Sequence, residues 1–332
     1  MKTITCIGGG TGISTLLLGL KKYNCKLNAI VTMTDSGGSS GKLRKELGVL
    51  PPGDVRQCLL ALASVNKKIN ELFCYRFDKG SLKGHNFGNL FFAALEKING
   101  DLVKAIDFTK RFLSVGGNVI PVTLVKTQLC VLLKNNKLIC GEDKITKSKL
   151  LLRHGVKKFF LKPRAWAYKD ALLAIEKADY LIFGPGNLYS SIIPNLLVSG
   201  IRKAIRQSKA KKIYICNLMT QAGQTDGFKV SHFVEVMEQY LGKGTLNFVI
   251  CNKKRPSSEI LRHCRKEGRY VGFVEADFEN FKDYIRYIPA NLLSNRIVQK
   301  NLADPLASMR SLVRHDSDKL AQVISDIVNI KK

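Results

Sequence analysis

The residues of this chain that could do chemistry lie in short polar stretches, and the first stretch has the composition of a phosphate-binding turn. The segment Gly8-Gly9-Gly10-Thr11-Gly12 follows the short β-branched run of residues 3–7 and precedes a helical pattern of leucines. Glycines let the backbone approach a ligand closely, and the N–H groups at the positive end of a helix dipole favour an anion such as phosphate. A plain strand-to-helix turn is the alternative, but it seldom needs four glycines in five residues.

This turn matches neither of the two best-known phosphate loops. In the dinucleotide pattern G-x-G-x-x-G the third glycine is replaced by Ile13. In the P-loop pattern, tested at Gly41 and Lys42, Ser36 replaces the first glycine and Leu43 replaces the Ser/Thr that would hold magnesium. Standard NAD binding and standard ATP hydrolysis are therefore disfavoured, which leaves another kind of Rossmann-like nucleotide or phosphosugar loop.

A second polar stretch follows the apolar run 27–33 and contains Asp35, Ser36, Gly37 and Gly38. An acidic residue at the carboxyl end of the second strand of a Rossmann unit often binds a ribose hydroxyl. The glycines and serines after it offer N–H and hydroxyl donors, which predicts a second anion-binding loop. A flexible loop fits the same composition.

Two further stretches could either cap helices or hold a ligand. Asp54 follows two prolines and could cap the next helix, or it could hold a metal or a substrate hydroxyl beside Arg56. Asn86 and Asn89 are natural caps, and they could equally bind a polar ligand. His85, next to them, is predicted to be a surface residue.

Three later stretches complete the set of candidate site residues. Two of them follow apolar strand patterns, and the third precedes a final helix that Asp316 is predicted to cap. Because carboxyl ends of parallel strands share one edge of a sheet, all of these turns are expected to meet there. The candidates are Gly184, Gly186, Asn187, Leu188, Tyr189 and Ser190, then Asn217, Thr220, Gln221 and Asp226, and finally Arg314.

Alternating strand and helix patterns predict the elements that position these turns. They indicate an α/β fold, Rossmann-like and three-layered, with a mostly parallel sheet. The whole of residues 1–332 is expected to be one domain, with a small inserted subregion at about 115–165. No chemistry is predicted for this middle region, where residues 129–133 and 137–140 indicate a β-hairpin appended to the parallel sheet.

Composition limits the partners of the chain. Its 54 basic and 26 acidic residues give a net charge of +28, but the basic residues are scattered, so a solvated surface is favoured and nucleic acid is not an expected partner. A basic nucleic-acid-binding protein is the alternative, which rests on charge alone. No apolar run is long enough for membrane insertion, and the first strand pattern leaves no room for a signal peptide. Nine cysteines with no C-x-x-C pair indicate a reduced, cytoplasmic protein.

Taken together, these segments resemble the YvcK/CofD-like family, and within it the YvcK branch known as gluconeogenesis factors. The resemblance implies a Rossmann-like fold and a cytoplasmic bacterial protein that binds UDP-sugars, UDP-N-acetylglucosamine in particular. It further implies a regulatory link between carbon metabolism and cell-envelope growth and cell shape. The matching segments are residues 8–12, 35–41, 50–56, 84–90, 184–198, 216–227 and 314–316.

The CofD branch provides the enzymatic alternative. Its members transfer a phospholactyl group from a guanosine diphosphate carrier to a deazaflavin alcohol with magnesium, so Asp54 would hold the metal or accept a proton and Arg56 would neutralise phosphate charge. The family's usual Asp-Asp pair is Asp35-Ser36 here, and no nucleophile–base pairing is evident, which favours binding over catalysis. No cofactor is expected to be required, although Mg²⁺ is compatible with the site. A homodimer is one possible assembly.

Overall fold

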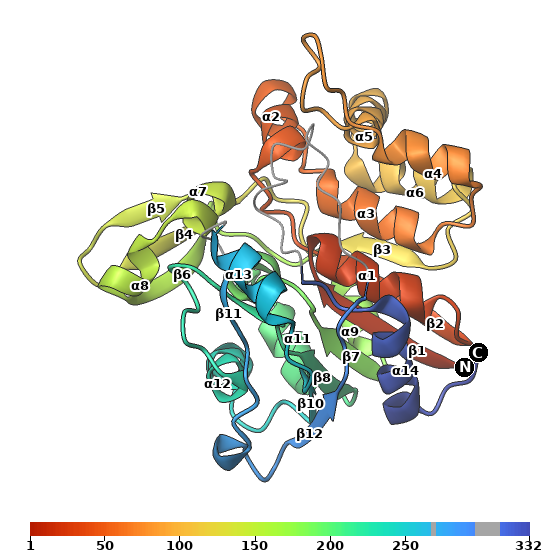
Figure 1. Ribbon diagram of the computed structural model, residues 1–332. Helices are drawn as coiled ribbons and strands as arrows, with labels where there is room; N and C mark the ends of the chain where they lie inside the picture. Colours follow the sequence, from red (N-terminus) through yellow and green to blue (C-terminus); the bar gives the residue numbers. More distant parts are fainter. Residues whose placement is uncertain (267–269, 296–312) are drawn as a thin grey trace.

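The computed structural model describes residues 1–266, 270–295 and 313–332, and its centre is a seven-stranded sheet (Figure 1). The strand order is β12-β10-β8-β7-β1-β2-β3, and every pair of neighbours is parallel. This confirms the predicted α/β fold. The strands are β1 (Lys2–Gly8), β2 (Cys25–Val31), β3 (Asn118–Pro121), β7 (Tyr180–Phe183), β8 (Lys211–Ile215), β10 (Phe248–Asn252) and β12 (Arg286–Ala290).

The central strands carry near-continuous apolar runs because they are covered on both faces. Ile4, Cys6 and Ile7 of β1 are fully buried, as are Ile213 and Ile215 of β8. Burial of successive residues, which point to opposite faces of a sheet, means that helices or loops cover both sides.

The register of the sheet brings the ends of its central strands to one edge. Gly8 of β1 lies opposite Val31 of β2, and Ile7 lies opposite Phe183 of β7. Phe183 in turn lies opposite Tyr214 of β8. The turns that follow β1, β2, β7 and β8 therefore leave the sheet side by side, as the sequence predicted.

Helices flank this sheet in two groups. In one group α1 packs against α3 and α14, and in the other α11 packs against α9 and α12. Among the helices of the described residues, none has the length and hydropathy that a bilayer-spanning segment requires. The flanking helices are α1 (Gly10–Leu20), α3 (Gly53–Leu62), α9 (Lys169–Glu176), α10 (Ile193–Leu197), α11 (Ile201–Gln207), α12 (Val230–Leu241), α13 (Ser258–Lys266) and α14 (Ser317–Val328).

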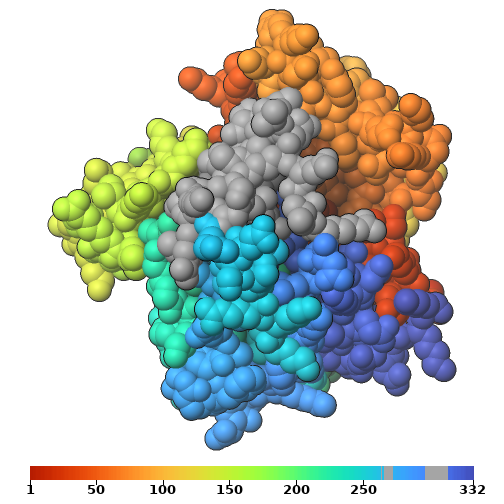
Figure 2. All heavy atoms as spheres, in the orientation of Figure 1, coloured from red at the N-terminus to blue at the C-terminus, as the bar shows by residue number. Residues whose placement is uncertain are grey.

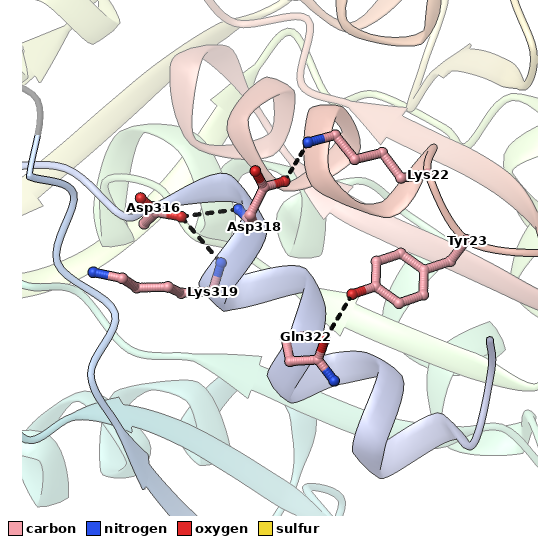
Figure 3. Close-up of polar contacts among 6 residues, drawn as sticks. All are labelled: Lys22, Tyr23, Asp316, Asp318, Lys319 and Gln322. Carbon is pink, nitrogen blue, oxygen red and sulfur yellow. Dashed lines mark hydrogen bonds and ion pairs between the residues drawn. The ribbon is translucent and has the colours of Figure 1, made fainter. Parts of the chain in front are cut away.

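The last helix, α14, is anchored beside the first (Figure 3). Gly19 of α1 permits this close approach, because a Cβ at that position would lie 2.1 Å from the carbonyl oxygen of Ser317. Tyr23 donates a hydrogen bond to Gln322 at 3.1 Å. Asp316 caps α14 by accepting from two backbone N–H groups at 3.0 Å each, which confirms the predicted cap.

A layer of four further helices stands at the top of Figure 1. Residues 38–41 of this layer were predicted as a loop, because glycine and serine are common in loops. They form instead the first turn of a helix. The helices of this layer are α2 (Gly38–Leu47), α4 (Lys67–Cys74), α5 (Phe87–Asn99) and α6 (Leu102–Phe112).

The predicted hairpin is present, but it does not extend the parallel sheet. β4 (Gln128–Leu133) pairs with β5 (Leu138–Cys140) on one side and with β6 (Val156–Lys162) on the other, so these strands form an antiparallel sheet of their own. Together with α7 (Glu142–Lys147) and α8 (Leu150–His154) they make the small lobe, residues 128–162, which projects from the body of the molecule in Figure 2.

Short elements interrupt the later loops. Met219–Gln221, predicted as loop, is strand β9, which pairs with β11 (Tyr270–Phe273). A single π-helical turn covers Leu188–Ile192, and a 3₁₀ turn covers Phe278–Asn280.

The state of the cysteines differs from the prediction at one pair. Cys6 and Cys251 of the sheet, and Cys216 directly after β8, are buried free thiols, as their apolar surroundings suggested. Cys130 and Cys140 are joined by a disulfide bond, which the prediction of a reduced compartment did not anticipate. They lie directly opposite each other on β4 and β5, a pairing that sequence spacing does not reveal.

Candidate ligand-binding site

A cavity of about 320 Å³ lies at the carboxyl edge of the central sheet. The turns after β1, β2, β7 and β8 line it, together with α2, α3, the small lobe and residues 313–315. In open α/β sheets this is the edge at which ligands bind, and the volume lies within the usual range of ligand pockets, roughly 300–1,000 Å³.

Most of the residues predicted for a site line this one cavity. They come from seven segments of the chain that are far apart in sequence. They are Gly9, Gly10, Thr11, Gly12, Asp35, Gly37, Asp54, Arg56, Asn89, Gly186, Asn187, Leu188, Ser190, Asn217, Gln221 and Arg314.

Other predicted residues support the fold around the cavity and do not line it. Asn86 caps α5, and its amide donates to the carbonyl of Tyr75 at 2.9 Å. Asp226 accepts a bond from the backbone of Gly223 at 2.6 Å. Their polar atoms are thus engaged with the backbone. The predicted residues outside the cavity lining are Gly8, Ser36, Gly38, Asn86, Gly184, Tyr189, Thr220 and Asp226.

Three helices begin at the cavity, and none has a side-chain cap. Their N-cap residues are Gly9 for α1, Gly37 for α2 and Pro52 for α3. A helix leaves its first N–H groups without partners inside the helix, and its dipole places partial positive charge at the same end. Such ends favour an anion. Two carboxylates lie beside them, since Asp35 accepts from the N–H of Gly37 at 2.9 Å and Asp54 lies in the first turn of α3.

The glycine turn is held close to its neighbours on two sides. A Cβ at Gly12 would lie 2.0 Å from the carbonyl oxygen of Pro185, so the turns after β1 and β7 touch through their backbones. A Cβ at Gly9 would lie 2.5 Å from Oδ2 of Asp54. Gly10 adopts a φ of +60°, which favours glycine over other residues.

Asp54 does not cap α3, as had been one prediction, because Pro52 is its N-cap and Asp54 lies inside the first turn. Its carboxylate faces Gly9 and Gly10. Among the described residues no group of three or more His, Cys, Asp or Glu side chains is arranged to hold a metal ion. A magnesium ion at Asp54 would therefore depend on oxygen atoms of the ligand itself, as magnesium bound through one or two carboxylates and substrate phosphates does.

Arg56 is held rigidly beside the cavity. It is buried, its Nε donates to Oδ1 of Asn89 at 2.8 Å, and its Nη1 donates to the carbonyl of Phe73 at 3.0 Å. Arg76 also lines the cavity, a residue that the sequence did not indicate, and it donates to the carbonyl of Gly84. With Arg314, three guanidinium groups stand around this cavity.

His85, predicted at the surface, is buried. Its Nδ1 lies 3.4 Å from Oγ of Ser39, a residue that lines the cavity. Burial lowers the pKa of His85, which favours the neutral ring. The prediction failed because the helical layer that covers His85 is formed by contacts distant in sequence.

The small lobe contributes acidic residues to the cavity, although no chemistry was predicted for this region. Glu142, Asp143 and Thr146 of α7 line it. Oγ of Ser36 donates to Oδ1 of Asp143 at 2.9 Å, and the backbone N–H of Asp143 donates to Ser36 at 3.2 Å. This pair of bonds fastens the start of α7 to the turn after β2, where Asp35 lies.

Glu142 is a carboxyl group of the cavity with a strongly perturbed pKa. Burial and the neighbouring charge of Asp35 raise the pKa of Glu142 to about 7. Thr146 donates a hydrogen bond to its Oε1 at 3.0 Å. No signal in the sequence marked this glutamate, since it lies in a lysine-rich stretch.

The turns after β7 and β8 are joined by their amides. Asn187 caps the π-helical turn by accepting from two backbone N–H groups at 3.1 Å, and its amide donates to Oε1 of Gln221. Asn217 donates to the carbonyl of Gly186 at 2.8 Å. These contacts hold the two turns together at the cavity.

A β-bridge between Leu293 and His315 brings the segment before α14 to the cavity, so that Arg314 lines it. Burial lowers the pKa of His315 to about 4, so its ring is neutral at physiological pH. The sequence had indicated Arg314 but not His315.

Comparison with known proteins agrees with this architecture. A family model described as 2-phospho-L-lactate transferase CofD matches residues 4–293. The gluconeogenesis factor of Bacillus subtilis is 36% identical to this chain over 98% of both chains. A protein of Thermotoga maritima that is provisionally named gluconeogenesis factor is 45% identical, also over 98% of both chains. A crystal structure of a UPF0052 family member from Bacillus halodurans superimposes with a TM-score of 0.87 at 36% identity and covers 98% of this chain and 99% of that one.

Proposed function

Because this chain belongs to the CofD/YvcK family and resembles its gluconeogenesis factors over nearly its whole length, we propose that it is a regulator that binds a nucleotide sugar. The ligand is UDP-N-acetylglucosamine or a close relative. The protein works in the cytoplasm, where this ligand reports the supply of carbon for cell-envelope growth and cell shape.

The observation that carries this proposal is that three helix N-termini, none capped by the side chain of its own N-cap residue, meet at one cavity. A diphosphate has enough oxygen atoms and charge to accept from more than one of these ends, and bound anions at helix N-termini gain from both N–H donors and the dipole. Arg56, Arg76 and Arg314 add charge of the same sign. Amides and hydroxyls of the later turns suit the polar groups of a nucleoside and a sugar.

A second candidate function is transfer of a phosphorus-containing group, as the name of the matching family model indicates. Asp54 and Asp35 both line the cavity, so one carboxylate could hold Mg²⁺ against the ligand phosphates while the other accepts a proton. Binding without turnover is preferred, because the similar proteins over the full length are named as factors.

Ligand-dependent melting tests the proposal. UDP-N-acetylglucosamine and UDP-glucose are expected to raise the melting temperature, while GDP and NAD at the same concentration have little effect, because a ligand stabilises the fold by RT ln(1 + [L]/Kd). No stabilisation by any UDP-sugar would overturn the proposal.

Phosphorus NMR then separates a binder from an enzyme. A binder leaves UDP-N-acetylglucosamine intact during long incubation with magnesium. Release of UMP or UDP that disappears in Asp54→Asn would instead identify a transferase or hydrolase that uses this carboxylate.

A further inference from the structure

The disulfide between Cys130 and Cys140 lies next to the part of the cavity that the small lobe supplies. Cys140 is the last residue of β5, and only Gly141 separates it in the chain from Glu142 and Asp143, which line the cavity. These two acidic residues are called the lobe wall below. Because Cys130 belongs to β4, the middle strand of the lobe, the disulfide ties the lobe wall to that strand.

Few other contacts hold the end of β5 and the first residues of α7. β5 is a three-residue edge strand that pairs with β4, and its first residue, Leu138, is exposed. Past the disulfide, Gly141 donates to the carbonyl of Leu129 at 2.9 Å, and Asp143 is bonded to Ser36. Segments with few buried contacts open locally at low cost in free energy. The disulfide is therefore a main restraint on the lobe wall.

The two sulfur atoms of this bond differ in access. Cys130 is fully buried in β4, whereas Cys140 is half-buried at the edge of the lobe sheet, so a thiolate from solution reaches Cys140 more readily. The small lobe carries nine basic and two acidic residues. Positive charge stabilises the thiolates that take part in disulfide exchange, so the lobe favours that reaction.

We propose that the Cys130–Cys140 disulfide is a reversible redox switch, which fixes the lobe wall when the bond is formed and releases it when the bond is reduced. This inference rests on the proposed function and adds regulation of the same cavity to it. The proposed function places the protein in the cytoplasm, where disulfides are usually transient and serve catalysis or redox sensing.

A dithiol reductant supplies the two electrons. One of its thiolates attacks the sulfur of Cys140, the S–S bond breaks, and Cys130 leaves as a thiolate that takes up a proton. The second thiolate of the reductant then displaces the sulfur of Cys140 from the mixed disulfide. The protein gains two thiols and the reductant becomes a disulfide.

The oxidised form should bind the ligand more tightly, because its lobe wall is already ordered. Ile145, further along α7, is buried, and its carbonyl accepts from Gln224 at 3.3 Å, so reduction should release only residues 138–143. Ordering this segment again when the ligand binds costs conformational entropy, which weakens affinity. Coupling between two sites is reciprocal, so a bound ligand should make the disulfide harder to reduce by the same factor.

Titration calorimetry with UDP-N-acetylglucosamine measures this coupling on the air-oxidised protein and on the protein kept in dithiothreitol. The reduced form should bind at least about fivefold more weakly. Cys140→Ser, which cannot form the bond, should bind like the reduced protein under both conditions. Cys74→Ser removes an exposed thiol of α4 that does not line the cavity, so this control should keep the full response to dithiothreitol.

Two measurements need no ligand. Denatured protein should take up two more thiol-reactive labels after reduction than before it. Hydrogen exchange should show the backbone amides of residues 138–143 exchanging at least about tenfold faster after reduction, while β4 and β6 keep their protection.

The outcomes separate the switch from the proposed function. Equal label counts, unchanged exchange, or equal affinities of the oxidised and reduced protein would overturn the switch and leave nucleotide-sugar binding standing. Absence of binding by the oxidised protein, together with faster exchange after reduction, would overturn the proposed function and leave the switch at the lobe wall in place.

Discussion

Substitution of Gly12 by alanine should separate the two glycine turns on which the cavity depends. The added Cβ would lie 2.0 Å from the carbonyl oxygen of Pro185, 2.6 Å from its carbonyl carbon and 3.0 Å from the amide nitrogen of Gly186. All three atoms belong to the backbone, so no side-chain rotation relieves the overlap. The turns after β1 and β7 must move apart by roughly 1.5 Å, given that carbon contacts are normally near 3.5 Å.

The expected cost follows from that geometry. Overpacking a well-packed site costs about 1–3 kcal/mol, and Gly12→Ala belongs at the upper end because the backbone must move. For 332 residues the unfolding entropy is about 0.7 kcal/mol/K, so each kcal/mol lowers the melting temperature by about 1.4 °C, which predicts a decrease of roughly 3–4 °C. The displaced turn should also weaken nucleotide-sugar binding by at least about tenfold, as misplaced donors lose hydrogen bonds.

Thermal melting with and without UDP-N-acetylglucosamine measures both effects. Gly116→Ala is the matched control, because its Cβ would meet only the carbonyl oxygen of Leu62, at 3.8 Å. If Gly12→Ala melts and binds like Gly116→Ala, the close contact between the two turns does not hold the site together and the reasoning is refuted.

Four further predictions concern single side chains. Arg314→Ala should weaken ligand affinity by about ten- to a hundredfold in calorimetry, since a charge-assisted hydrogen bond contributes roughly 1.5–3 kcal/mol. Unchanged affinity would show that Arg314 does not bind the ligand. Asp54→Asn removes a negative charge from the first turn of α3, where the helix dipole favours it, and should lower the free energy of unfolding by about 0.3–1 kcal/mol; a much larger decrease would show a further structural role. Asp316→Ala should lower the free energy of unfolding by about 1 kcal/mol in urea titrations, whereas Asp318→Ala, which removes an exposed ion pair, should have a clearly smaller effect (Figure 3). Burial raises the pKa of Glu142 to about 7, so the folded state binds this proton more tightly than the unfolded state does. The free energy of unfolding should therefore fall by up to roughly 3 kcal/mol as pH rises from about 4.5 to 7. Glu142→Gln should abolish that part of the pH dependence.

The parallel sheet and its polar edge were determined by the sequence itself. Residues 27–33 and 180–183 form near-continuous apolar runs, a pattern typical of a strand buried on both faces, and each run is followed by glycine or polar residues. A parallel sheet brings all such ends to one edge, so the convergence of Gly9, Asp35, Asn187 and Asn217 on one cavity could be predicted without any knowledge of packing. Local rules likewise placed the Asp316 cap.

Contacts between distant segments were decided only by the tertiary structure. Ser36 and Asp143 are separated by 107 residues, and the two hydrogen bonds between them place Glu142 in the cavity. No local pattern encodes such a contact, because a carboxylate in a lysine-rich stretch has the same composition whether it faces solvent or a ligand. The independent sheet of the small lobe has the same origin: β4 has two edges, and packing rather than periodicity selects β5 and β6 as its partners. Periodicity determines which faces of an element are buried, while the identity of the partner depends on the free energy of the whole fold.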